Sequence, residues 1–209
     1  MAVPFDFKKE YKELYLPKDK VVLIDVPDMR FIMVDGVGDP NNNSGFEQAV
    51  ELLYALSYAI KMSSKKGKQL EGFFEYVVPP LEGLWWVDSG GFSLTERGNW
   101  VWTVMIRQPD FIGDEVFAWA CNEVQKRKGL HIGNARLETF CEGLCVQVLH
   151  IGPYATEPET MLKMNEFIEN NVLKCTLGNG GKHHEIYLSD PRKCKPEQMK
   201  TVLRHPLKK

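Results

Sequence analysis

The chain has 209 residues and a formal net charge of -2, with 44% hydrophobic and 26% charged residues, which is typical of a globular protein and excludes a disordered or fibrous one. Apart from Lys65, Lys66 and Lys68, the basic residues are interspersed with acidic ones, so direct nucleic-acid binding is not expected. No segment approaches the roughly 18 consecutive apolar residues of a membrane helix, and residues 1–9 lack a secretion signal, so we expect a cytoplasmic protein with no membrane partner.

Residues 1–29 are expected to form an N-terminal arm that ends in a short strand at 21–26. The arm mixes charged and aromatic residues, as in KKEYKELYLPK, and reads as irregular. From residue 30 the sequence becomes more regular, which marks the start of the main domain, over residues 30–209.

The first regular unit is a strand followed by a turn and a helix. Residues 30–36 (RFIMVDG) are rich in β formers and end at the glycine and proline residues of VGDPNNNSG. Ser44 followed by Glu47 has the pattern of a capping box, and apolar residues then recur at helical spacing up to Met62.

Extended segments follow the basic loop SSKKGK. They lie at residues 73–78, 84–87 and 100–106. Residues 113–128 then predict a linking helix, because acidic residues stand at its start, basic residues at its end, and Gly129 can stop it.

A second unit of the same kind begins with a strand at 144–151. Gly152 and Pro153 make the turn, and Thr156 with Glu159 forms a second capping box that opens a helix. A strand follows at 183–188, and Pro196 predicts a C-terminal helix over 196–204.

The two units indicate an internal repeat, at about 30–110 and 140–190. Two such halves side by side would make a pseudo-twofold α+β body whose sheets leave a central ligand cleft between them. The alternative is chance, because β-turn-α-β order is common in α+β proteins.

Glu185 is the residue most suggestive of chemistry. The alternation in HHEIYLSD places His183, Glu185 and Tyr187 on one face of a strand, and His184 and Ile186 on the other, apolar face. A glutamate among β formers indicates either a solvated sheet face or a wall that faces a ligand.

Aromatic residues favour the second reading. Four tryptophans cluster in two strand segments, and together with tyrosines they could wall a flat slot, although a single tryptophan is more simply explained as core. The residues expected to line this slot are Trp86, Trp100, Trp102, Tyr54, Tyr58, Tyr76 and His183.

We expect no metal ion and no cofactor. His183 and His184 are adjacent strand residues that face opposite sides, and the pair Cys141 and Cys145 has no second ligand pair after it. The chain also lacks the fingerprints of a nucleotide-binding loop, a serine nucleophile elbow and a zinc protease.

Five segments carry a family resemblance when taken together. The chain contains PPLEGLWW, WVWTVMIRQPDF, LCVQVLHIGPYATEPETM, HHEIYLSDPRK and PEQMKTVLRHP in this order. They resemble the successive signatures of the GyrI-like small-molecule-binding family. The resemblance implies a duplicated β-α-β-β (SHS2-type) fold, whose central cleft has Glu185 and aromatic rings facing planar, often cationic, compounds.

The resemblance also implies a function. In many relatives this domain follows a helix-turn-helix segment and acts as a drug sensor, but the N-terminal arm here is too short to be such a segment. Stand-alone members of the family hydrolyse cyclopropane-bearing alkylating compounds in an aromatic cage. The segments LEGLWW and WVW resemble those of the stand-alone members, which implies a xenobiotic hydrolase. In such an enzyme Glu185 would be the general acid or base, and Tyr154 or Tyr187 would donate a hydrogen bond to the oxyanion. The alternatives are a non-catalytic multidrug binder and a ligand sensor for a regulator. Either a monomer or a homodimer would suit a small-molecule partner.

Overall fold

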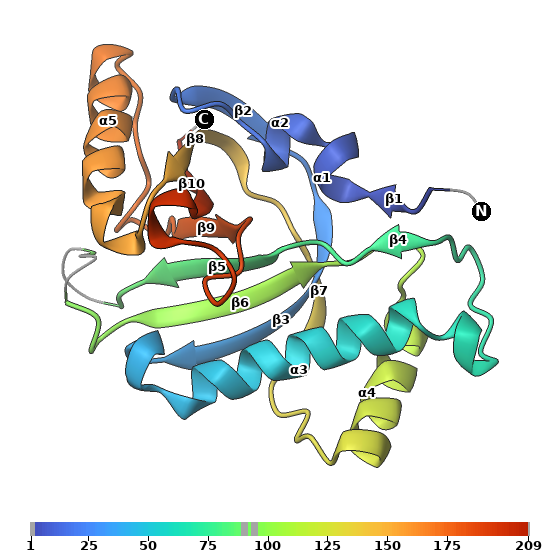
Figure 1. Ribbon diagram of the computed structural model, residues 1–209. Helices are drawn as coiled ribbons and strands as arrows, with labels where there is room; N and C mark the ends of the chain where they lie inside the picture. The colour runs from blue at the N-terminus through green and yellow to red at the C-terminus, as the bar shows by residue number, and fades with distance from the viewer. Residues whose placement is uncertain (1–2, 89–91, 93–95, 209) are drawn as a thin grey trace.

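An antiparallel sheet of eight strands organises the computed structural model, which describes residues 3–88, 92 and 96–208 (Figure 1). The strand order is β2-β8-β10-β9-β5-β6-β3-β7. The strands are β2 (Val22–Val26), β3 (Met29–Val37), β5 (Leu81–Trp86), β6 (Val101–Arg107), β7 (Arg136–Phe140), β8 (Gly143–Ile151), β9 (His183–Tyr187) and β10 (Lys200–Pro206). The sheet curls, and helices pack against it, which confirms the predicted α+β class.

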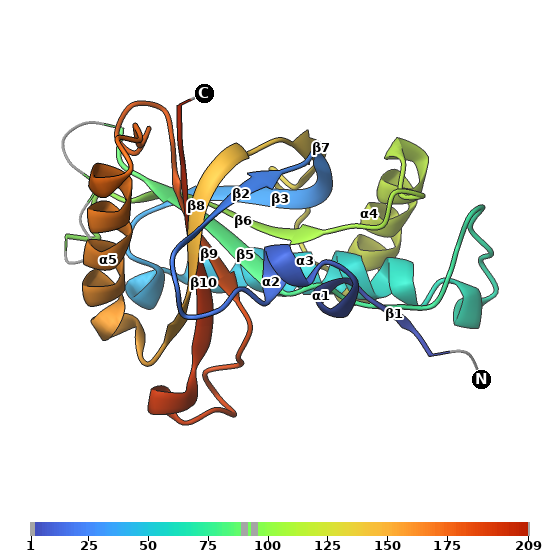
Figure 2. The same ribbon diagram turned by 90° about the horizontal axis from the view of Figure 1, so that it is seen from above.

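The longer helices are α3 (Ser44–Lys61), α4 (Asp114–Lys128) and α5 (Glu157–Asn170). α3 packs on β3 and β6, α4 packs on α3, and α5 packs on β8. Figure 2 shows α4 and α5 at opposite ends of the molecule, with α3 between them. Within the described residues, no helix is both long enough and apolar enough to cross a membrane.

The helices begin and end for local reasons. α3 buries residues spaced three or four apart, among them Ala49, Leu52, Leu53, Leu56 and Ile60. Its cap is Asn43, whose side chain accepts from the Gly45 N–H, so the helix is capped one residue before the predicted Ser44. At α5 the cap is Thr156, as predicted, but its hydroxyl donates to the Pro153 carbonyl rather than capping the helix.

The N-terminal arm covers the sheet face opposite α3. It forms β1 (Phe5–Asp6), α1 (Phe7–Glu10) and α2 (Lys12–Tyr15), and β1 pairs with β4 (Tyr76–Val77). Phe7, Leu14 and Tyr15 are buried in one cluster with Phe31 and Met105 of the sheet. The arm was predicted to be irregular, and it is ordered because its apolar side chains complete this core.

The predicted C-terminal helix at 196–204 is wrong. Pro196 opens a single 3-10 turn, η4 (Pro196–Gln198), and the chain then continues as β10 between β8 and β9. Residues 201–205 are at most 1% exposed, and a strand lets their side chains be buried on both faces of the sheet.

The order of elements repeats along the chain. A strand, a helix and two further strands follow one another twice, as β3-α3-β5-β6 and as β8-α5-β9-β10. In both units the last strand lies in the sheet between the other two strands, giving the orders β5-β6-β3 and β9-β10-β8. The second unit therefore continues to residue 206, beyond the predicted limit of 190. The units join through the pairing of β5 with β9, so they share one sheet rather than leaving a cleft between two sheets.

Candidate functional site

A cleft of about 530 Å³ lies on the α3 side of the sheet. It lies between α3, β9, the end of β5, the start of α5 and the loop over residues 188–192. Its aromatic lining consists of Phe46, Tyr54, Tyr58, Trp85, Trp100, Tyr154 and Tyr187. The cleft follows α3 from Phe46 to Tyr58, a helix length of about 18 Å.

Glu185 lies in the wall of this cleft and is 6% exposed. The Tyr187 hydroxyl donates to its Oε2 at 2.6 Å, and Nε2 of His183 lies 3.0 Å from its Oε1. All three residues stand on the same face of β9, as the strand alternation predicted. Glu185 is therefore held at a fixed position with both oxygens engaged.

Glu157, a second carboxyl group in the cleft, was not predicted. It is the first residue of α5 and is 2% exposed, and its Oε1 has no hydrogen-bond partner among the described residues. Burial, together with the charge of Glu185, raises the pKa of Glu157 to about 9, against a smaller opposing effect of Arg97. Glu157 is therefore protonated at neutral pH and can donate a proton.

The two candidate oxyanion donors lie at this end of the cleft. The rings of Tyr154 and Tyr187 meet edge to face, with centroids 6.0 Å apart. Burial, and then the charge of Glu185, raises the pKa of both hydroxyls, so each keeps its proton. Tyr187 donates to Glu185, and Tyr154 lies beside the carboxyl pair.

Trp85 provides the floor of the cleft between Phe46 and Trp100. Its ring stacks on Phe46 with centroids 5.7 Å apart, and its centroid lies 5.1 Å from that of Trp100. The indole lies over Gly83, where a Cβ atom would stand 2.8 Å from Nε1. Because Gly83 pairs with Glu185, the glycine brings the indole next to the carboxylate.

Of the residues predicted for this site, the structure places Glu185, Tyr154, Tyr187, Trp100, Tyr54 and Tyr58 in the cleft. Four others lie elsewhere. Trp86 faces the opposite side of β5, Tyr76 packs in the cluster under the arm, and Trp102 is buried beneath α3. His183 is fully buried behind Glu185 and acts on the cleft through that contact.

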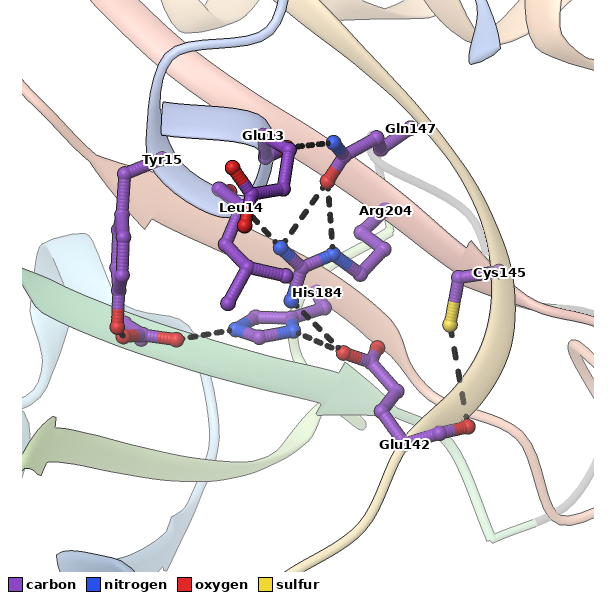
Figure 3. Close-up of polar contacts among 9 residues, drawn as sticks. Glu13, Leu14, Tyr15, Glu142, Cys145, Gln147, His184 and Arg204 are labelled. Atoms are coloured by element: carbon purple, nitrogen blue, oxygen red, sulfur yellow. Dashed lines mark hydrogen bonds and ion pairs between the residues drawn. The ribbon is translucent and has the colours of Figure 1, made fainter. Parts of the chain in front are cut away.

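The opposite face of β9 carries a charged network where an apolar face was predicted (Figure 3). His184 lies between two carboxylates, with Nδ1 2.9 Å from Glu142 and Nε2 3.0 Å from Glu82. Arg204 donates to Glu142 at 3.0 Å and to Gln147. These residues are at most 1% exposed, apart from Glu142, whose side chain is 4% exposed.

The network also holds the N-terminal arm. Arg204 donates to the carbonyl of Leu14 at 3.0 Å, Gln147 donates to the carbonyl of Glu13, and the Tyr15 hydroxyl donates to Glu82 (Figure 3). The arm is thus fixed to β5, β8 and β10 by polar contacts as well as by its apolar core.

Opposite charges set the protonation of this network. Burial by itself would raise the pKa of Glu142, but His184 and Arg204 outweigh it and lower the value to about 2. Burial would likewise lower the pKa of His184, but Glu142 and Glu82 outweigh it and raise the value to about 9. His184 is therefore positively charged and Glu142 negatively charged at neutral pH.

A curled sheet covered by helices, with an aromatic cleft of about 530 Å³, is typical of a small-molecule-binding protein. The family model of the GyrI-like small molecule binding domain matches residues 19–208, and the chain belongs to that family. The match includes β2, which pairs with β8 in the main sheet. No curated protein matches the chain.

Solved structures of the same fold include close relatives. An uncharacterized conserved protein from Listeria innocua is 48% identical, with a TM-score of 0.93 over 98% of this chain and 100% of that one. A hydrolase from Listeria innocua is 46% identical, with a TM-score of 0.89 over 98% and 100%. The C-terminal domain of EcmrR shares the fold, with 14% identity and a TM-score of 0.54 over 91% and 98%.

Proposed function

We propose that this protein binds planar aromatic xenobiotics in the cleft and hydrolyses electrophilic members of that class, including cyclopropane-bearing alkylating compounds. The observation that carries the proposal is a pair of buried carboxyl groups, Glu185 and Glu157, in an aromatic cleft. The second is kept protonated by burial and by the charge of the first. Carboxyl groups held in opposite protonation states supply one base and one acid.

The aromatic walls account for binding. Phe46, Trp85 and Trp100 line the inner part of the cleft, and the exposed rings of Tyr54 and Tyr58 extend the wall along α3, where a planar ligand can stack on them. Such stacking contributes about 0.5–1.5 kcal/mol per ring pair beyond the buried area. A ligand lying along this wall would also exclude water from the carboxyl pair.

The chemistry is the addition of one water molecule. Glu185 takes a proton from water while the oxygen of that water bonds to a cyclopropane carbon. The carbon–carbon bond breaks, and its electron pair moves to a conjugated carbonyl oxygen, which receives the proton of Glu157. Tyr154 can donate a hydrogen bond to the same oxygen. Proton exchange with solvent then returns both carboxyl groups to their starting states.

The comparison with Listeria innocua supports this reading. The relative described as a hydrolase is 46% identical over nearly the whole chain and has the same fold. Under the proposal, this chain shares hydrolytic activity with that relative.

The test is incubation of the purified protein with a cyclopropane-bearing indole alkylator, followed by mass spectrometry of the small molecule. We expect a product heavier by one water, formed faster than in buffer. Both Glu185→Gln and Glu157→Gln should slow its formation by a factor of about 10²–10⁴. Glu159→Gln is the matched control, since Glu159 is exposed two residues further along α5.

The same experiment separates the alternative function. Unaltered compound that nevertheless quenches tryptophan fluorescence would identify a non-catalytic binding protein. In that case Glu185→Gln should weaken the binding of cationic ligands while leaving that of neutral ones, because Glu185 would act as a counter-ion.

A further inference from the structure

Two buried histidines lie behind Glu185, away from the cleft. His183 on β9 and His205 on β10 are 0% and 1% exposed. Nδ1 of His183 lies 2.8 Å from Nε2 of His205, and Nε2 of His183 lies 3.0 Å from Glu185. Glu185, His183 and His205 thus form a continuous hydrogen-bonded chain that leads away from the ligand.

The far end of this chain is a nitrogen atom that lacks a partner. Within residues 3–88, 92 and 96–208, Nδ1 of His205 is buried and makes no hydrogen bond. Leaving a buried polar atom unpaired is unfavourable, so this arrangement costs stability.

The unpaired atom decides which nitrogens carry protons. If His183 were an imidazolium, both its nitrogens would donate, and Nε2 of His205 would have to accept. The single proton of His205 would then be on Nδ1, as a buried donor without a partner, which is rarer in proteins than an unpaired acceptor. If both rings are neutral and protonated on Nε2, the unpaired atom is a bare acceptor.

We propose that His205 donates Nε2–H to His183 and so keeps His183 neutral, which makes His183 a positioning residue that holds Glu185 through an uncharged donor. This inference rests on the proposed role of Glu185 as the base. An imidazolium at His183 would form an ion pair with Glu185 and weaken it as a base, whereas a neutral ring orients the carboxylate and leaves it able to accept a proton.

The surroundings agree with a neutral pair. Among the described residues, the titratable groups around Glu185 include His183, Tyr187, Tyr154 and Glu157, of which the tyrosines and Glu157 are uncharged near neutral pH. Arg97 is a cation in the same cleft, and a nearby positive charge disfavours a second one on His183. The Phe92 ring lies beside His183, with centroids 5.4 Å apart. Burial holds the pKa of His205 well below its usual range, against a smaller opposing effect of Glu142, so His205 is the neutral ring that can donate from one nitrogen only.

The first test reads the protons directly. Two-bond ¹H–¹⁵N correlation spectra of the intact protein should show both histidines neutral and protonated on Nε2 from pH 6 to pH 8. A His183 resonance typical of an imidazolium would overturn the proposal. This test uses no substrate, so its outcome is independent of whether the protein is a hydrolase.

The second test compares His205→Gln with His205→Met, two side chains of similar length. Glutamine can still donate an N–H to Nδ1 of His183, and methionine cannot. Without that donor, the hydrogen bond from His183 stabilises the charged form of Glu185 less. The acid limb of the plot of kcat/KM against pH should therefore shift to higher pH by about half to one unit in His205→Met, and it should not shift in His205→Gln.

Equal acid limbs in the two variants would overturn the proposal, even if both lose activity through altered packing. If the parent protein forms no hydrolysis product, the proposed function fails, and the spectra alone decide the state of the histidine pair.

Discussion

Glu185 and Glu142 have buried side chains on opposite faces of the sheet. Glu185 contacts His183 on one face of β9, and Glu142 contacts His184 on the other. Glu142 is bound by charged His184 and Arg204, which lower its pKa to about 2. Glu185 is bound by the hydroxyl of Tyr187 and, under our proposal, by a neutral His183. Under the proposal, the two glutamates differ in role because charged donors surround Glu142, whereas uncharged donors surround Glu185.

The immediate surroundings of the two glutamates also differ in how completely their polar atoms are paired, although, among the described residues, Tyr76 and Arg107 keep unpaired atoms elsewhere on the arm side. The network around Glu142 pairs the carboxylates, His184 and Arg204 with each other and with the N-terminal arm. The cleft side keeps unpaired atoms on Glu157, Trp85 and His205 within the part of the chain that the structure describes. Of these unpaired atoms, those of Glu157 and Trp85 belong to residues that line the cleft, where a ligand could supply the missing partner.

The largest expected effect on stability comes from breaking the charged side. Glu142→Gln leaves His184 and Arg204 without their shared carboxylate, and it should lower the free energy of unfolding by about 3–5 kcal/mol. Urea unfolding measures this change. The matched variant Glu185→Gln should cost less than about 1.5 kcal/mol, because with His183 neutral, as proposed, it removes no ion pair. Similar losses in the two variants would contradict the distinction between the two sides.

A second prediction concerns the pH dependence of stability. The pKa of His184 is raised from 6.5 to about 9, so its contribution is fully present below pH 6.5 and is lost as the pH rises through 9. The stability difference between the parent protein and His184→Gln should therefore shrink by on the order of 3 kcal/mol between pH 6 and pH 10. Urea unfolding at both pH values tests this, and a constant difference would show that His184 is neutral.

The cleft side should respond to pH through activity. Because the pKa of Glu157 is raised to about 9, the proposed acid loses its proton as the pH rises through that value. We expect kcat/KM to fall about tenfold per pH unit above 9, and this limb should be absent from the residual activity of Glu157→Gln. An alkaline limb that persists in the variant would assign it to another group.

The smallest effect separates two adjacent tryptophans. Trp85→Phe removes part of the cleft floor and should raise the Kd of a planar ligand about fivefold, which corresponds to roughly 1 kcal/mol. Trp86→Phe is the control, since Trp86 lies on the other face of β5. Fluorescence titration measures both. A larger effect in Trp86→Phe would mean that the ligand binds on the sheet face covered by the N-terminal arm, which would contradict the proposed cleft.

Sequence patterns predicted the parts of this structure that depend on local periodicity. The shared face of Glu185 and Tyr187 follows from residue spacing, α3 from a capping pattern and helical spacing, and α4 from acidic residues at its start, basic residues at its end and Gly129. The choice between Trp85 and Trp86 did not, because both faces of β5 are buried and alternation cannot say which one meets the ligand.

Other features depend on contacts between distant segments. Glu157 has the position of an ordinary acidic residue in the first turn of a helix, and its burial against Glu185 arises only in the folded chain. The charges near His184 come from β5, the turn before β8, and β10, so the sequence around His184 showed an apolar face. The sequence pattern predicted a helix where the chain forms β10. For that reason, neither Arg204 nor His205 was expected beside β9.

The position of β10 also has a consequence for synthesis of the protein on the ribosome. β8 and β9 are both translated before β10, the strand that hydrogen-bonds to each of them. Until residues 200–206 emerge, β8 and β9 lack the neighbour that joins them, and the side chains of His184 and Glu185 stay hydrated. Assembly of this half of the sheet should therefore be a late event that depends on contacts distant in sequence, which makes it slow compared with formation of α3.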